Sequence, residues 1–83
     1  MYKVVFEKSA EKEFLKLEKK TQLLVAQKIL DLRNGYFAQD KPLKGKYQGK
    51  FRKRAGNYRI IYLKEDHQLI ITLIRIAHRK EVY

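Results

Sequence analysis

The spacing of hydrophobic residues along this 83-residue chain changes near its middle. In the first half, Ala10, Phe14 and Leu17 recur at the i, i+4, i+7 spacing of an amphipathic helix, and residues 21–34 carry a second stripe of the same kind. From residue 50 onward the hydrophobic residues alternate with polar ones or form short runs, which is typical of β-strands. The chain is therefore predicted to be an α+β domain with its helices in the first half.

Short polar signals set the predicted ends of the elements in the first half. Residues 2–6 are predicted to form a strand, and Ser9 is a favourable N-cap for the helix that follows. Thr21 can cap a second helix, and Asn34-Gly35 ends it, because both residues tolerate the left-handed conformation of a helix C-cap. Only a few residues around Lys19 separate the two helices, so an antiparallel helical hairpin is expected.

The second half is predicted to form three strands after a loop at residues 36–48. The predicted strands span residues 50–54, 58–63 and 69–76. The last of them is the most apolar, so it is expected at the centre of the sheet. The order βααβββ, in a single domain of residues 1–83, places a helical hairpin on one face of a small, mostly antiparallel twisted sheet.

Positive charge is concentrated between Lys41 and Lys64. This segment has nine basic residues and no acid, so it supplies +9 of the formal net charge of +11. The nine are Lys41, Lys44, Lys46, Lys50, Arg52, Lys53, Arg54, Arg59 and Lys64. Phe51, Tyr58 and Tyr62 are interleaved with them, and a merely solubilising face would not require acids to be excluded. The segment is therefore predicted to bind a polyanion, either a nucleic acid or an acidic protein.

The composition excludes several kinds of site. The chain has no cysteine, so neither a disulfide nor a thiolate metal site is available, which suits a reducing cytoplasm. No apolar run approaches the length of a membrane span or a signal-peptide core, so no membrane partner is expected. The carboxylates of the second half are Glu65, Asp66 and Glu81, and the two histidines lie eleven residues apart, so no metal-ligand cluster is expected. An enzyme of this sequence would use Arg, Lys, His and Tyr without a cofactor.

Whether the arginines of the two predicted hairpin strands meet depends on the register of the hairpin. Lys50, Arg52 and Arg54 share one face of their strand because side chains alternate. A three-residue loop pairs Arg54 with Tyr58 and sends Arg59 to the opposite face, whereas a four-residue loop pairs Arg54 with Arg59. The sequence leaves both registers open. Directly opposed like charges destabilise a strand pair, so the clustered register makes sense only on a surface that binds phosphate.

A metal-free basic cluster suits cleavage of RNA rather than DNA. The RNA 2′-hydroxyl is an internal nucleophile, so an enzyme needs only to deprotonate it, hold it in line and stabilise the charge of the transition state. Arginine serves the last purpose well, because its planar guanidinium matches two phosphate oxygens at once. A phenol or lysine that acts as the base near neutral pH needs a pKa lowered by neighbouring cations.

Three short motifs add a resemblance to a known family. They are Leu43-Lys44-Gly45, Tyr58-Arg59-Ile60-Ile61-Tyr62 and the ending His78-Arg79-Lys80-Glu81-Val82-Tyr83. With the βααβββ order, they make the chain resemble the RelE-like branch of the RelE/ParE toxin superfamily of type II toxin–antitoxin systems over nearly its whole length. The resemblance implies a metal-independent endoribonuclease that cuts mRNA in the ribosomal A site and leaves a 2′,3′-cyclic phosphate. It also implies an acidic antitoxin as partner, with operator DNA bound only together with that antitoxin.

The resemblance also assigns roles to individual residues. Those implied to be catalytic are Lys50, Arg52, Arg59, Arg79 and Tyr83. Those implied to bind RNA are Lys44, Lys46, Arg54 and His78. Arg52 stands where a lysine is common in the family, which makes it less suited to proton transfer. The spacer from Arg79 to Tyr83 is shorter than usual, and the C-terminal helix of many members is missing.

Two further functions remain open on the sequence. One is ParE-like inhibition of DNA gyrase without nuclease chemistry. The other is a basic module that binds nucleic acid or antitoxin and has lost activity. The retained basic strand and Tyr83 favour the ribonuclease, because the gyrase-directed branch tends to lose those side chains.

Overall fold

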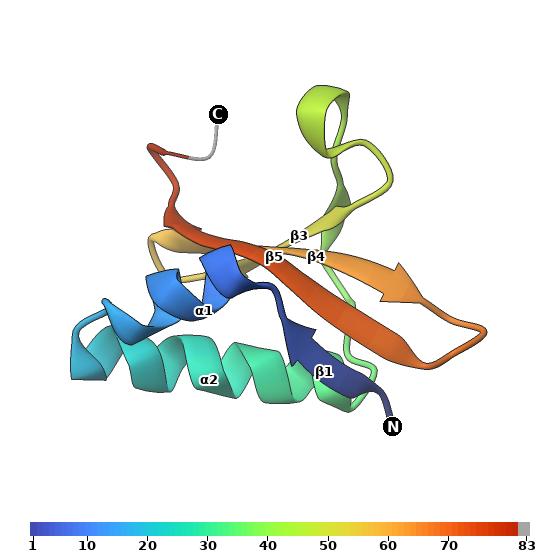
Figure 1. Ribbon diagram of the computed structural model, residues 1–83, viewed down its shortest axis with the longest axis horizontal. Helices are drawn as coiled ribbons and strands as arrows, with labels where there is room; N and C mark the ends of the chain where they lie inside the picture. The colour runs from blue at the N-terminus through green and yellow to red at the C-terminus, as the bar shows by residue number, and fades with distance from the viewer. Residues whose placement is uncertain (82–83) are drawn as a thin grey trace.

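The computed structural model describes residues 1–81 of the chain (Figure 1). Its elements, in chain order, are β1 (Lys3–Phe6), α1 (Lys8–Leu15), α2 (Lys19–Arg33), β2 (Lys41–Pro42), the 3-10 helix η1 (Gly45–Tyr47), β3 (Phe51–Ala55), β4 (Tyr58–Glu65) and β5 (Ile70–His78). The strands form one sheet in the order β1-β5-β4-β3-β2. This confirms the predicted α+β fold. No helix in the described part of the chain is long and apolar enough to span a membrane.

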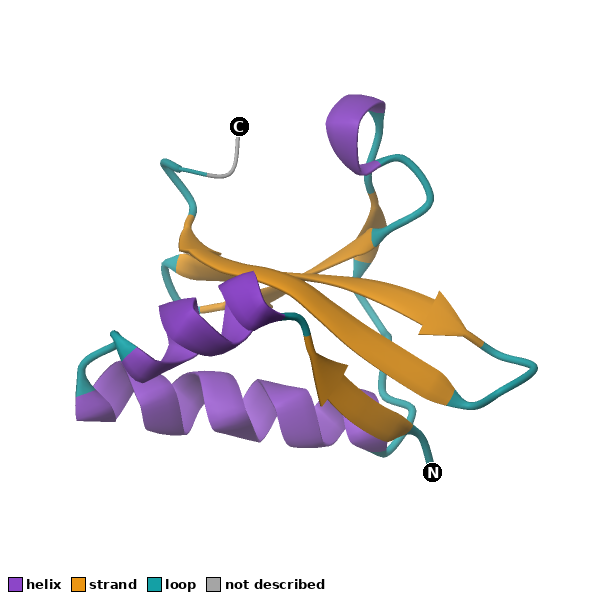
Figure 2. Cartoon of the chain, in the orientation of Figure 1, coloured by secondary structure: helices purple, strands orange, loops and turns teal. Residues whose placement is uncertain are grey.

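The sheet has two faces of different character. Both helices pack on one face, as Figure 1 shows, and the main hydrophobic core lies between them and the sheet. Its buried members are Ala10, Val25, Leu32, Ala55, Ile60, Tyr62, Ile71, Leu73 and Ile76. The η1 turn and the segment after β5 rise on the opposite side (Figure 2). We call this helix-free side of β3, β4 and β5 the open face.

The strand β5 was predicted at the centre of the sheet, and this is wrong by one position. It lies between β1 and β4, while β4 is the middle strand of the five. The pairing with β1 is parallel and covers residues 70–73 of β5, whereas β4 pairs antiparallel along residues 70–78. A strand that is flanked on both sides and covered by helices is apolar in either position, so apolarity indicates an internal strand but not the central one.

Both helices begin before the predicted caps. The α1 helix follows Glu7 and the α2 helix follows Glu18, and neither residue makes a side-chain capping hydrogen bond. Ser9 lies inside α1, where its hydroxyl donates to the Ile74 carbonyl oxygen at 3.1 Å and ties the helix to β5. Thr21 lies inside α2. The predicted end of α2 is confirmed, because Asn34 is its C-cap and Gly35 follows with φ +81°.

The segment at residues 36–48 is more ordered than the predicted loop, because it contains β2 and η1. A buried polar cluster on the helix side of the sheet holds its start. The Asp40 carboxylate accepts a hydrogen bond from the Tyr62 hydroxyl at 2.5 Å and pairs with the Lys53 ammonium at 3.0 Å. The Phe37 ring stacks on Tyr62, with centroids 6.3 Å apart. These contacts fix where β2 and η1 leave for the open face.

Candidate active site

A tight turn sets the register of the β3–β4 hairpin. Ala55 pairs with Tyr58, so the turn consists of two residues, Gly56 and Asn57. Gly56 has φ +62°, a conformation that costs glycine little and other residues more. The turn is therefore shorter than either predicted loop, because Ala55 and Tyr58 belong to the strands.

The resulting pairing is the clustered one of the two registers that the sequence left open. Arg54 lies opposite Arg59, and Arg52 lies opposite Ile61. Residues that face each other in a strand pair point to the same side, so the three arginines share one face of the hairpin. That face is the open one, because Ile60, between Arg59 and Ile61, is buried in the helix-side core.

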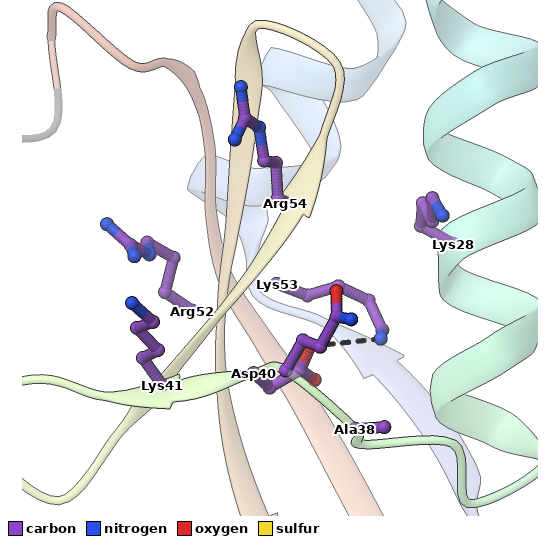
Figure 3. Close-up of a pocket in the computed structure, with 8 residues that line it drawn as sticks. Lys28, Ala38, Asp40, Lys41, Arg52, Lys53 and Arg54 are labelled. Carbon is purple, nitrogen blue, oxygen red and sulfur yellow. Dashed lines mark hydrogen bonds and ion pairs between the residues drawn. The ribbon is translucent and has the colours of Figure 1, made fainter.

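Lys53 does not belong to this basic surface. It lies between Arg52 and Arg54 on β3, and its side chain points to the helix side, where the ion pair with Asp40 leaves it 6% exposed. Figure 3 shows Lys53 and Arg52 on opposite sides of the β3 ribbon. One of the nine cations of the basic segment is therefore neutralised inside the fold.

A small hydrophobic cluster forms the floor of the open face. Ile61 and Ala77 are buried there, and Leu43, Tyr47 and Ile74 pack around them. The cluster ties η1 and the end of β2 to β4 and β5. It therefore fixes the basic side chains of these elements to a rigid sheet, which a site that must orient a phosphate requires.

Arg59 is a half-buried arginine of the open face. It lies on the central strand β4, with Arg54 opposite it on β3 and Ala77 opposite it on β5. Its Nε and Nη1 atoms are buried. Because the guanidinium keeps its charge even when buried, Arg59 concentrates positive potential in the middle of the open face.

The rim of the face carries further lysines. Lys41 of β2 lies directly opposite Arg52, a like-charge pair that the sequence did not predict because β2 itself was not predicted. The Lys50 carbonyl oxygen accepts a hydrogen bond from the Leu43 amide at 2.9 Å, which extends the β2–β3 ladder by one step. Lys44 and Lys46 are exposed at η1, and the Lys46 ammonium lies 5.6 Å from the centroid of the Tyr47 ring.

The predicted residues at the end of the chain fall in three different environments. Arg79 is exposed, and its amide donates to the Asn57 carbonyl oxygen at 2.8 Å, so it lies beside the hairpin turn. His78 pairs with Tyr58 and contacts that ring edge-on at 5.4 Å on the helix side, away from Arg52 and Arg59. The structure thus gives His78 a packing contact rather than a place among the clustered arginines. Tyr83 lies outside the described residues.

Arg75 is a charged residue at the site that received no predicted role. It lies opposite Ile61. Its Nη2 atom donates to Glu13 of α1 at 2.6 Å, and the same carboxylate accepts from the Ile76 amide at 2.8 Å. Hydrogen bonding to Glu13, and then to the Tyr47 hydroxyl, raises the pKa of Arg75, so it is a fixed cation. The sequence feature that could have indicated a role for Arg75 is the presence of an arginine inside the most apolar strand.

The arrangement can bind and polarise phosphate. In the strand ladders, the three clustered arginines lie opposite Lys41, Ile61, Ala77 and one another. Within residues 1–81, no group of three or more His, Asp or Glu side chains is placed to hold a metal ion. Several guanidiniums on a rigid strand pair are suited to stabilising charge on a transferring phosphoryl group.

Comparison with known sequences assigns the chain to a family. The sequence profile described as "ParE toxin of type II toxin-antitoxin system, parDE" matches residues 4–83. The chain belongs to the RelE/ParE toxin superfamily. The resemblance read from its motifs is thereby confirmed. Toxin RelG of Mycobacterium tuberculosis (strain ATCC 25618 / H37Rv) is 29% identical to this RelE/ParE toxin over 83 residues, which cover 99% of the chain and 95% of RelG.

Solved structures of other toxins have the same fold. A chain of the toxin–antitoxin complex RelBE2 from Mycobacterium tuberculosis superposes with a TM-score of 0.69 at 25% identity, over 94% of this toxin and 98% of that chain. The isolated E. coli RelE toxin gives 0.79 at 19% identity, over 94% and 84%. YafQ from E. coli strain BL21(DE3) gives 0.81 at 13% identity, over 100% and 99%. At such low identities, RelE and YafQ support the architecture alone.

Proposed function

We propose that this RelE/ParE toxin is a metal-independent endoribonuclease that cleaves mRNA, and that it does so in the ribosomal A site. The observation that carries the proposal is the hairpin register, which gathers Arg52, Arg54 and Arg59 on one helix-free face. Opposed arginines destabilise a hairpin unless an anion lies between them, so this register favours a phosphate ligand. Membership of the RelE/ParE superfamily supports the function as a toxin.

The proposed reaction is an internal transfer at the scissile phosphate. The 2′ oxygen gives up its proton and attacks the adjacent phosphorus, and the bond from phosphorus to the 5′ oxygen breaks. The products are a 2′,3′-cyclic phosphate and a 5′-hydroxyl that has gained a proton. Arg52, Arg59 and Arg79 are proposed to stabilise the charge on the phosphoryl oxygens. We assign the two proton transfers to Lys50 and Tyr83, the only members of the predicted catalytic set that are not arginines.

The flanking residues are proposed to hold the RNA rather than to react. Lys44, Lys46 and Arg54 are exposed around the open face and can contact phosphates on either side of the cleaved bond. His78 is left out of this set, because its contact with Tyr58 places it on the other side of the sheet.

An acidic antitoxin is the proposed protein partner. The matched solved structures include the intact E. coli RelBE toxin-antitoxin complex and the YoeB-YefM complex from Staphylococcus aureus, which supports a cognate partner for this toxin as well. With a net charge of +11, the toxin would attract an acidic segment that covers the open face and blocks RNA. Contact with operator DNA is proposed only for the complex with the antitoxin.

Cell-free translation tests the proposed function. The toxin is expected to arrest translation and to cut mRNA at codon-related positions, leaving 2′,3′-cyclic phosphate ends. The double variant Arg52→Ala/Arg59→Ala should leave mRNA intact, whereas Lys12→Ala, an exposed change on α1, should cut as the wild type does. Intact mRNA with double-strand DNA breaks would instead support gyrase inhibition, and neither effect would support a binding module without activity.

A further inference from the structure

A basic pocket lies at the outer edge of β3, beside the open face. Its volume is about 440 Å³. The residues that line it are Lys28, Ala38, Gln39, Asp40, Lys41, Arg52, Lys53 and Arg54 (Figure 3). They come from α2, from the segment before β2, and from β2 and β3, so the pocket reaches from the sheet to the helix layer. Of these residues, the cleavage chemistry proposed above uses only Arg52.

The pocket exists because β2 is short. Within the described residues, β2 pairs with β3 only at Phe51 and Arg52, so no strand covers the outer edge of β3 from Lys53 to Ala55. An uncovered edge in a sheet normally needs protection against pairing with another chain. Here charged side chains surround it, and Arg54 is exposed at its middle.

The charge of the pocket favours an anion. Five cations and one carboxylate line it, which gives a net charge of +4. The carboxylate is Asp40, which is already engaged by Lys53 and Tyr62. Lys28 is half-buried and forms no ion pair within residues 1–81. Its ammonium can therefore pair with a phosphate that enters the pocket.

The pocket is continuous with the proposed active site. Arg52 and Arg54 line the pocket and also belong to the open face with Arg59. In Figure 3, Lys41 and Arg52 point to one side of the β3 ribbon, while Lys28 faces it from α2 on the other side. The described residues that line the pocket include no aromatic side chain, so they offer contacts to phosphates but no platform for a base.

We propose that the single-stranded RNA backbone on one side of the cleaved phosphate crosses the β3 edge and enters this pocket, where Lys28 and Lys41 bind its phosphates. This inference rests on the proposed ribonuclease function and extends its substrate site to α2. The contact is independent of sequence, because only phosphates are bound. It strengthens RNA binding without taking part in the chemistry.

A length series of non-cleavable RNA tests the pocket. The probes are 2′-O-methyl oligonucleotides of increasing length, and the measured quantity is the dissociation constant at several salt concentrations. Wild-type affinity should rise when the RNA becomes long enough to reach the pocket. Lys28→Glu should cancel that rise, by about fivefold or more, and should lower the slope of log K against log salt by about 0.7. Lys28→Gln should show a smaller loss in the same direction.

The matched control is Lys12→Glu, which makes the same change of net charge at an exposed position of α1 outside the pocket. Circular dichroism and melting temperature verify that each variant is folded. If Lys28→Glu and Lys12→Glu bind RNA equally at every length, the inference is wrong. If Lys28→Glu loses binding of a poly-glutamate peptide but keeps that of RNA, the pocket serves an acidic protein segment instead. Length-dependent binding without any mRNA cleavage by the wild type would retain the pocket and overturn the endoribonuclease.

Discussion

Arg59 combines a permanent charge with partial enclosure, which makes it the most informative single residue of the open face. Its neighbours in the ladders are Arg54 and Ala77, and its Nε and Nη1 atoms are buried. We expect Arg59→Ala to lower the rate constant of mRNA cleavage by about 10²–10³-fold, the usual effect of removing one preorganised donor to a developing oxyanion. Single-turnover cleavage at saturating mRNA measures it.

Arg59→Lys separates charge from geometry at the same position. Lysine keeps the positive charge but loses the planar fork, so we expect it to recover mRNA binding much better than the cleavage rate. A full recovery of cleavage by lysine would show that only charge matters at this position. Because the side chain is partly enclosed, thermal unfolding of both variants must accompany the kinetics.

Tyr62 shows how a single hydroxyl positions a whole segment. It donates to Asp40, while its ring stacks with the rings of Phe37 and Phe51. Tyr62→Phe keeps the ring contacts and removes the donor to a buried carboxylate, so the free energy of unfolding should fall by roughly 1–3 kcal/mol. Urea unfolding measures the change. Tyr36→Phe, at a side chain that is 63% exposed, should have no comparable effect.

The same tyrosine predicts part of the alkaline behaviour of the protein. Burial, and then the hydrogen bond to Asp40, raise the pKa of Tyr62 well above its ordinary value of 10.0. Below pH 10 this phenol is protonated in both states and the native hydrogen bond contributes fully. Above pH 10 the unfolded chain releases the proton first, so stability falls by up to about 1.4 kcal/mol per pH unit. The difference in the free energy of unfolding between the wild type and Tyr62→Phe should therefore become smaller as the pH rises from 10. A difference that stays constant with pH would contradict this prediction.

At the scale of elements, a side chain of α1 replaces a missing strand at the edge of β5. β1 pairs with β5 only as far as Leu73, so the edge of β5 beyond it has no strand partner on that side. There Glu13 accepts from the Ile76 amide with one oxygen and from the Arg75 guanidinium with the other. One carboxylate thus satisfies a backbone donor and fixes a cation, and it joins the helix layer to the sheet.

We expect Glu13→Ala to lower the free energy of unfolding by about 1–2 kcal/mol, because it removes the acceptor of a backbone amide and of the guanidinium of Arg75, whose side chain is only 28% exposed. Urea unfolding measures the loss, and Glu11→Ala, an exposed change in the first turn of the same helix, is the control. If the two variants unfold alike, Glu13 does not act as an edge cap for β5. The rate of mRNA cleavage by Glu13→Ala should fall only to the extent that Arg75, without its partner Glu13, moves from its position.

The elements also show how far the sequence could predict this protein. The spacing of hydrophobic residues was enough to predict β1, both helices and the three long strands, because each of these elements buries regularly spaced side chains. It could not reveal β2, a pair of residues whose only strand signature is its partner β3. The start of α1 was misplaced because Ser9 bonds to β5 rather than to its own helix. Local preference was outweighed there by tertiary contact.

For the candidate site, the sequence predicted which residue types take part but not the direction in which their side chains point. Basic residues at alternate positions predicted a shared face for Arg52 and Arg54, and two alternatives for Arg59. The choice between them depended on a turn shortened to two residues, which sequence periodicity does not determine. Lys53 was counted with the surface charges because nothing in the sequence linked it to Asp40, thirteen residues earlier. The direction of a side chain and the partner with which it pairs depend on tertiary contacts.

At the scale of the whole molecule, the toxin carries a net charge of +11, most of it in the segment that forms and borders the open face. Arg54 lies opposite Arg59 in the β3–β4 pair, and Lys41 lies opposite Arg52 in the β2–β3 pair, so this end of the sheet contains two like-charge pairs. Such pairs lower the stability of the free protein and raise its affinity for polyanions. A substitution that removes one of these charges is therefore expected to raise the stability of the free protein and to weaken its binding of RNA.

Arg54→Ala tests this coupling directly. Because Arg54 is exposed and opposes Arg59, its removal should leave the melting temperature of the free toxin unchanged or slightly higher. A non-cleavable RNA at 100 times its dissociation constant should stabilise the wild type by about 2.7 kcal/mol, roughly 10 °C or more in a domain of this size. At the same RNA concentration, the shift of Arg54→Ala should be distinctly smaller, and that of Lys12→Ala unchanged. A variant that loses free stability and keeps the full RNA shift would mean that Arg54 supports the fold rather than the ligand.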